Sequence, residues 1–110
     1  MEWNLLSDIH QLNTIDEESK LIKVLLFKHS TRCSISDTAL GRIERKWKEE
    51  YKTVLKVYFL DLIANRNLSD TISQHYSIRH QSPQALVISH GKCVFEQTHS
   101  EISLEDILKN

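Results

Sequence analysis

The chain has 110 residues, 40% of them apolar, and only two glycines and one proline, which excludes a disordered chain and leaves enough apolar surface for one core. Fourteen basic and fifteen acidic side chains nearly balance, so the charge offers nothing that would gather nucleic acid or an anionic membrane surface. No stretch is long and apolar enough to span a membrane and the N-terminus lacks a secretory signal pattern, so we expect a single domain, residues 1–110, in the cytoplasm.

The N-terminal part of the chain predicts a helix and a buried strand. A short edge strand is expected at Trp3–Leu5, and Ser7 is expected to cap a helix that ends near Ser19. The segment Lys23–Lys28 is apolar at consecutive positions, as in a strand covered by helices on both faces. We therefore place this strand in the middle of a sheet.

The central part continues the alternation of helix and strand. Apolar residues at helical spacing predict a long helix from Ser34 to about Tyr51, with its charged residues on the solvated face. A second central strand is expected at Val54–Leu60, and a short helix opens at Asn67 or Ser69. Crossover helices between these strands require parallel neighbours.

The C-terminal part predicts a hairpin and a last helix. The apolar run Ala85–Ile88 leads through a turn at His90–Lys92 into a strand from Cys93 to Gln97. Ser103 and Asp106 have the spacing of a capping box for a final helix. The order, (β)αβαβαββα, is that of an α/β fold with a central mixed sheet flanked by helices, the thioredoxin topology.

Cys33 is the strongest candidate for a chemically reactive residue. It ends a polar loop after the first buried strand and stands at the start of the longest predicted helix. Free backbone N–H groups and the positive end of the helix dipole favour thiolate over thiol there. The alternative, a small buried apolar residue, is less compatible with this placement. We therefore expect Cys33 to be a nucleophile.

Three blocks of sequence carry a family resemblance over nearly the whole chain. They are Phe27–Ser36 (FKHSTRCSIS), Asp61–Ile63 with Arg66, and Ser82–Ala85 with Gly91–Lys92. These blocks resemble the bacilliredoxin (YtxJ-like) branch of the thioredoxin superfamily. The resemblance implies a cytoplasmic thiol-disulfide oxidoreductase that removes bacillithiol, a low-molecular-weight thiol, from protein cysteines by taking it onto Cys33.

The resemblance also implies roles for residues around Cys33. Ser36 stands where dithiol thioredoxins have a resolving cysteine, which makes this chain a monothiol form, and Ser34 stands where many relatives have proline. A cis bond is implied for Ser82–Pro83, which would present the Ser82 backbone to an extended substrate. No cofactor is implied beyond bacillithiol as co-substrate, and the implied partners are S-thiolated proteins.

Other residues are weaker candidates for substrate contact. Arg32 offers a fixed charge beside the sulfur, although a solvated loop arginine is an equal alternative. Thr31 is included among the substrate-binding candidates, with hydrogen bonding to the loop backbone as its alternative. The last strand should return His99 to the active end, as a ligand contact or as an exposed loop residue. Asp61 could relay protons or satisfy the following helix start.

Cys93 is not expected to resolve Cys33. Its turn should lie about 20 Å from the active end at ~3.3 Å per strand residue, and a disulfide needs Cα atoms within about 7 Å. With two cysteines and no secretory signal, a reduced compartment is expected. The six histidines and two cysteines match no metal site of recognisable spacing, so no metal is predicted.

Two other functions remain open at this point. An iron-sulfur carrier could hold a cluster between Cys33 and an external thiol, although the CGFS signature of such monothiol proteins is absent. A thioredoxin-like interaction module without catalysis is the second alternative.

Overall fold

The computed structural model describes all residues from 1 to 110. Its elements follow one another in the predicted order, with two short 3-10 helices added. They are β1 (Asn4–Leu5), α1 (Gln11–Glu18), β2 (Lys23–His29), α2 (Ser34–Lys46), η1 (Glu49–Thr53), β3 (Leu55–Asp61), α3 (Arg66–His75), β4 (Gln84–Ser89), β5 (Lys92–Thr98), η2 (His99–Glu101) and α4 (Leu104–Lys109). The short edge strand at the N-terminus is present as β1.

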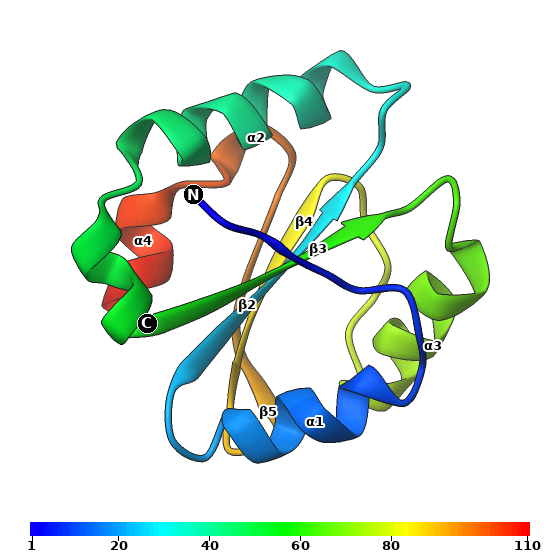
Figure 1. The fold of residues 1–110 in the computed structure, drawn as a ribbon. Coiled ribbons are helices and arrows are strands. Elements are labelled where there is room, and N and C mark those ends of the chain that lie inside the picture. Colours follow the sequence, from blue (N-terminus) through cyan, green and yellow to red (C-terminus); the bar gives the residue numbers. More distant parts are fainter.

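The five strands form one mixed sheet in the order β1-β3-β2-β4-β5 (Figure 1). β3 runs parallel to β1 and β2, because each connection passes through a helix, while β4 is antiparallel to both β2 and β5. β2 therefore lies at the centre of the sheet, as its apolar run predicts.

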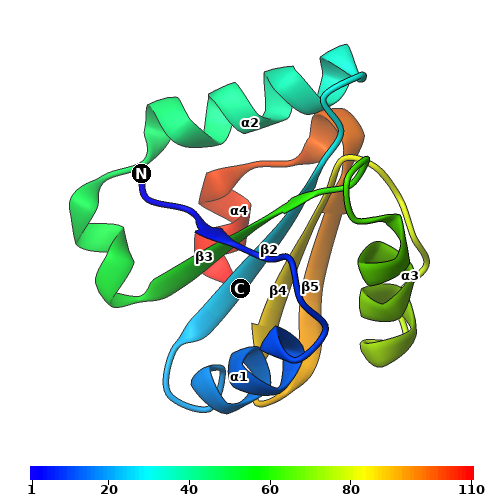
Figure 2. The same cartoon turned by 45° about the vertical axis from the view of Figure 1, so that its right-hand side comes forward.

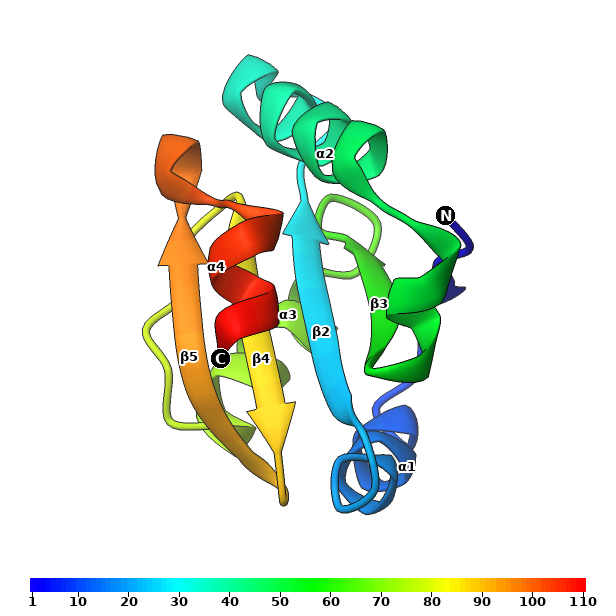
Figure 3. The ribbon, with the colours of Figure 1, turned by 90° about the vertical axis from the view of Figure 1, so that its left-hand side faces the viewer.

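Helices cover both faces of this sheet. α2 and α4 lie in front of the sheet in Figure 3 and α3 lies behind it, while Figure 2 shows α1 and α3 below and beside the strands. β2 supplies both interfaces: Val24 and Leu26 face α1 and α3, and Leu25 and Phe27 face α2 and α4. All four side chains are almost completely buried, which explains why apolar residues occupy consecutive positions. None of the helices has the length and apolar character needed to cross a membrane.

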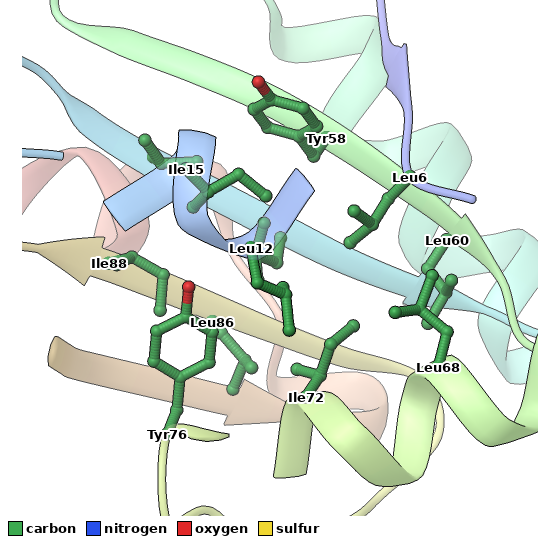
Figure 4. Packing of buried hydrophobic residues seen from close by; sticks show 12 residues of the cluster. Leu6, Leu12, Ile15, Tyr58, Leu60, Leu68, Ile72, Tyr76, Leu86 and Ile88 are labelled. Atoms are coloured by element: carbon green, nitrogen blue, oxygen red, sulfur yellow. The ribbon is translucent and has the colours of Figure 1, made fainter. Parts of the chain in front are cut away.

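The core on the α1 and α3 side shows how the helices are held. Leu12 of α1 and Ile72 of α3 point toward each other and toward Leu86 of β4 (Figure 4). Truncating a buried leucine or isoleucine of this kind costs about 2–5 kcal/mol. The packing on this side leaves the opposite face of the sheet to α2, the helix that begins at Cys33.

The helix after Cys33 is shorter than expected. α2 ends at Lys46 rather than near Tyr51, because Trp47 adopts an extended backbone with φ −65° and ψ 137°. The chain then turns through η1, and the rings of Trp47 and Tyr51 meet edge to face with centroids 5.6 Å apart. Both aromatics pack against the α2 and α4 core. The apolar spacing is therefore satisfied by a turn that neither glycine nor proline marks.

Other boundaries also differ from the expectation. Ser7 does not cap α1, which begins at Gln11; the Gln11 side chain instead accepts hydrogen bonds from the backbone N–H groups of Ser7 (2.8 Å) and Asp8 (2.9 Å). Val54 precedes β3 and is 56% exposed, so that strand begins one residue later than predicted and runs to Asp61. α3 begins at Arg66, with Asn65 as its N-cap residue.

The C-terminal predictions are confirmed in detail. His90 and Gly91 both have positive φ, 52° and 73°, the pairing that a two-residue hairpin turn requires and that glycine adopts most easily. The Ser103 hydroxyl accepts a hydrogen bond from the Asp106 backbone N–H at 3.4 Å and so caps α4. β5 returns the chain to the end of the sheet where Cys33 lies, and α4 then runs back toward the start of β2, where the Lys23 ammonium bonds to the Asn110 carbonyl.

Candidate active site

Cys33 occupies the N-cap position of α2. β2 ends at His29, and Cys33 follows a three-residue loop in an extended conformation with φ −119° and ψ 117°. Its carbonyl accepts the first helical hydrogen bond from the Asp37 N–H at 3.1 Å, and its own N–H donates to the Ser30 carbonyl at 3.2 Å. The thiol takes no part in capping and is half-buried, so the sulfur lies at the open end of α2. This is the placement expected for a nucleophilic cysteine.

The side chain of Ser36 supports the loop that leads to Cys33. Its side chain is fully buried, and its hydroxyl accepts a hydrogen bond from the Ser30 N–H at 3.0 Å. The same oxygen lies 2.7 Å from His29 Nδ1, while His29 Nε2 lies 3.5 Å from the Asp37 carboxylate. A chain of polar contacts thus runs from the end of β2 to the first turn of α2. It joins the two elements that hold Cys33.

Sequence reasoning did not identify this support. Ser36 stands out in the sequence only as the residue that replaces a resolving cysteine, and His29 only as part of the FKHSTRCSIS block. A signal was present, because polar residues at both ends of a short strand-to-helix loop are suited to satisfy its free backbone groups. The site therefore includes a buried positioning layer.

The lone proline lies beside the same end of β2. The Ser82–Pro83 peptide bond is cis, as the resemblance implies. In the antiparallel register Lys28 pairs with Gln84, so one step further along Pro83 lies alongside His29. Pro83 is buried, and its carbonyl accepts a hydrogen bond from the His99 N–H at 3.1 Å. The cis proline, the end of β2 and the start of η2 consequently meet at the Cys33 end of the sheet.

The remaining predicted site residues surround this end of the sheet. The side chains of Thr31, Arg32 and Ser34 are exposed and have no hydrogen-bonding partner within the protein. His99 is exposed and has a left-handed backbone, with φ 55°. The Ser82 hydroxyl is buried without a partner. The structure thus places all of these residues at the end of the sheet where Cys33 lies.

The candidate Asp61 and the nearby Lys28 both have structural roles. The Asp61 carboxylate accepts hydrogen bonds from the backbone N–H groups of Ile63 (3.1 Å) and Ala64 (3.4 Å), so it stabilises the turn before α3. Lys28 points to the opposite face of the sheet from His29, because side chains alternate along a strand. Its ammonium contacts Ser73 Oγ at 3.1 Å and His80 Nδ1 at 3.3 Å. Neither side chain is directed at Cys33.

The environment of Lys28 perturbs its protonation. Burial lowers the pKa of Lys28 from 10.5 to about 8, against the opposing pull of the Asp70 and Glu96 carboxylates. Burial, together with the Lys28 charge, also lowers the pKa of His80. His80 lies in the loop that ends at the cis proline, so this partly buried contact connects β2 with that loop.

Cys93 lies at the other end of the sheet. It pairs with Ile88 of β4, which in turn pairs with Val24 near the start of β2, whereas Cys33 lies beyond the last residue of that strand. Both cysteines are free thiols. Cys93 donates a hydrogen bond to the Phe95 carbonyl at 3.3 Å, and burial raises its pKa. The expectation that Cys93 lies far from Cys33 is confirmed.

The sequence pattern of a known family matches almost the entire chain. The family is described as monothiol bacilliredoxin BrxC, and the match covers residues 4–107. A solved structure provisionally described as an oxidoreductase with a thioredoxin fold is 30% identical, with a TM-score of 0.79 over 96% of this chain and 89% of that one.

More distant solved structures share the fold. The thioredoxin of Malassezia sympodialis is 16% identical, with a TM-score of 0.77 over 98% of this chain and 89% of its own. The thioredoxin of Trypanosoma brucei brucei is 18% identical, with a TM-score of 0.74 over 99% and 93% of the two chains. At this level of identity the similarity establishes the thioredoxin fold alone.

Proposed function

Since the chain belongs to the monothiol bacilliredoxin family and is a thiol-disulfide oxidoreductase of thioredoxin fold, we propose that it removes bacillithiol, or a similar small thiol, from protein cysteines. The observation that carries this proposal is that Cys33, at the free end of α2, and Pro83 lie at the same end of the sheet. Its substrates are proteins whose cysteines carry the small thiol as a mixed disulfide. Family membership argues against the alternative of an interaction module without catalysis.

The exchange needs one protein sulfur. The Cys33 thiolate attacks the sulfur of the small thiol in the mixed disulfide, so that a new S–S bond forms as the old one breaks. The substrate cysteine leaves as a thiolate and takes a proton from water. Cys33 then carries the small thiol until a second small thiol attacks the adduct, releasing a small-molecule disulfide and the free Cys33 thiolate. One disulfide exists before and after each step.

Ser36 restricts the protein to this monothiol route. A hydroxyl cannot form a disulfide with Cys33, and Ser36 is already engaged with His29 and Ser30. Cys93 lies at the opposite end of the sheet. The adduct on Cys33 therefore persists until an external thiol arrives.

The surroundings of Cys33 supply the surfaces for both halves of the substrate. We assign the Ser82 backbone to an extended protein segment, and the backbone N–H of His99 bonds to the neighbouring Pro83 carbonyl. Thr31, Arg32 and Ser34 are exposed and flank Cys33 in the chain, so we assign them to contact with the small thiol. We assign Arg32, which has no partner in the protein, to a carboxylate of the small thiol. In this scheme bacillithiol is a co-substrate, no bound cofactor is needed, and the reducing cytoplasm is the site of action.

The test uses a bacillithiolated protein and three forms of this chain. Wild type should remove the small thiol and acquire its mass on Cys33, as measured by intact mass spectrometry and peptide mapping. Cys33→Ser should lose this exchange completely while keeping its circular dichroism spectrum. Cys93→Ser should keep most of the activity. Equal loss in both variants would overturn the assigned roles.

The same preparations separate exchange from cluster transport. A thiol exchange enzyme should remain without visible absorption when it is purified anaerobically, and should acquire a single thiol adduct. Visible absorption that disappears in Cys33→Ser would instead indicate an iron-sulfur carrier.

A further inference from the structure

A hollow opens beside the first turns of α2, between this helix and η2. Its volume is about 140 Å³, and its lining comprises Ser34, Ile35, Thr38, Arg42 and Ser100. The hollow begins one residue beyond Cys33, and η2 lies next to α2 (Figure 3). It is the hollow whose lining comes closest to the sulfur in sequence.

The four lining residues from α2 form one face of the helix. Ser34, Thr38 and Arg42 are spaced by four residues and Ile35 lies between them, so their side chains follow one another along the same side. The Thr38 hydroxyl donates to the Ser34 carbonyl at 3.0 Å, and Ile35 is 46% exposed. The face therefore combines hydroxyl groups and an apolar side chain near Cys33 with a cation at its far end.

The guanidinium of Arg42 has donors that no acceptor in the protein satisfies. Its Nη1 donates to the Ser100 carbonyl at 3.3 Å, which is its one hydrogen bond, and its Nε is buried without an acceptor. No carboxylate lies within ion-pair distance of Arg42, because the six ion pairs of the protein involve other residues. A guanidinium has five N–H donors, and its fork geometry matches a carboxylate.

We propose that this hollow binds a carboxylate of the small thiol while its sulfur is bonded to Cys33, with Arg42 as the cation that receives it. The inference rests on the proposed function and extends it from the reacting sulfur to recognition of the thiol. It assigns specificity to a helix face that is separate from the Arg32 loop. The small volume favours a compact thiol over a protein segment.

Distance supports the proposal. Nine positions separate Cys33 from Arg42, about 13 Å along the axis at ~1.5 Å per residue. Long helical side chains tend to lean toward the N-terminus, which favours a guanidinium position closer to Cys33 than the Cα. A thiol whose carboxylate is several bonds from the sulfur can span the remainder, whereas a two-carbon thiol cannot.

The nearby acidic groups do not compete for Arg42. The Asp37 carboxylate faces His29 at 3.5 Å, and Glu44 accepts a hydrogen bond from the Trp3 indole at 3.2 Å. Glu101 follows Ser100 directly but forms no ion pair. The cation is therefore free to receive a carboxylate from a ligand.

The experiment measures how fast Cys33 is thiolated by two disulfides of nearly equal size. Glutathione disulfide carries two carboxylates on each half, and the disulfide of glutathione diethyl ester carries none; the rate constants come from intact mass spectrometry in a Cys93→Ser background. Arg42→Gln should slow the reaction with glutathione disulfide about threefold to tenfold and leave that with the ester nearly unchanged. Bacillithiol disulfide should respond as glutathione disulfide does.

Arg45→Gln is the matched control, because it removes the same charge from an exposed position of the same helix. It should leave both rate constants unchanged. Arg42→Lys should recover part of the rate with glutathione disulfide. For the unaltered Arg42 protein, that rate should fall with added salt more steeply than the rate with the ester.

Three results would contradict the proposal. Equal slowing of both disulfides by Arg42→Gln would show that Arg42 acts through the fold of the site. Equal rates and equal salt dependence for the two disulfides in the presence of Arg42 would show that no carboxylate is recognised, even if the glutamine variant does not fold. A slowdown confined to thiolated proteins would assign the hollow to a protein segment. Failure of the proposed function is distinct, because Cys33 would then react with neither disulfide.

Discussion

At the scale of the residue, Ser36 connects the chemistry of the site to its stability. It occupies the position that makes the protein a monothiol form, and its hydroxyl satisfies two groups of the Cys33 loop, the Ser30 N–H and His29 Nδ1. The contact with His29 is buried and the contact with Ser30 is partly buried, so water cannot replace them at no cost. One side chain thus removes a resolving sulfur and holds the loop in place.

Ser36→Ala should destabilise the protein by about 1–3 kcal/mol, because it leaves buried polar groups without a partner. The measurement is the urea concentration at the midpoint of unfolding, compared between proteins whose free energy of unfolding has the same dependence on urea concentration. Thr71→Ala is the control, since it removes an exposed hydroxyl that bonds only to the Asn67 carbonyl of its own helix. A Ser36→Ala midpoint equal to that of Thr71→Ala would show that the buried contacts contribute nothing.

At the scale of the element, α1 is attached to the hairpin at the far end of the sheet. The Ser19 carbonyl accepts a hydrogen bond from the His90 N–H at 2.9 Å, and the Ser19 hydroxyl accepts one from the Gly91 N–H at 2.8 Å. The carboxylate of Asp16 accepts hydrogen bonds from the Tyr76 hydroxyl at 2.7 Å and lies 2.6 Å from His75 Nε2. The C-terminal end of α1 is therefore bonded to both the hairpin and the end of α3.

Ser19→Ala should lower the free energy of unfolding by about 1–2 kcal/mol, since it leaves the Gly91 N–H without its acceptor. Amide hydrogen exchange of Gly91 should accelerate more than that of residues in the middle of β2. Ser7→Ala provides the comparison, because its exposed side chain does not cap α1. A loss of stability in Ser7→Ala as large as in Ser19→Ala would contradict this account.

At the scale of the whole molecule, Lys28 links global stability to pH. Burial lowers its folded-state pKa from 10.5 to about 8, whereas the amine keeps its proton to about 10.4 in an unfolded chain. Between these values the unfolded state binds more protons, so this group's contribution to stability rises with pH. Below pH 8 the amine is charged in both states, and the destabilisation is complete.

Lys28→Met should therefore raise the free energy of unfolding at pH 7 by about 1 kcal/mol, and the gain should shrink as the pH approaches 10. Denaturant titrations of wild type and variant at several pH values measure this difference in the free energy of unfolding. Other groups, such as Tyr58, Tyr76 and Cys93, ionise in both proteins, so their contributions cancel in the difference. A variant less stable than wild type at pH 7 would show that attraction to Asp70 and Glu96 outweighs the cost of burial.

Much of this fold could be predicted from local features of the sequence. The consecutive apolar residues of β2 require cover on both faces, Gly91 marks the hairpin turn, and Ser103 caps α4. Cys33 stands at a strand-to-helix junction that is visible in the residue pattern. The cis bond before Pro83 came from the family resemblance, and the structure confirms it. These features are short-range, so neighbouring residues are enough to specify them.

The amino-acid sequence by itself determined the order of the elements, the central strand and the position of the candidate nucleophile, because periodicity and single special residues act over a few positions. Only the tertiary structure decided that α2 ends at Lys46, that Lys28 contacts Ser73 and His80, and that Arg42 faces η2 without a carboxylate partner. These outcomes depend on contacts between segments far apart in the chain, which set where a helix ends and which side chains meet.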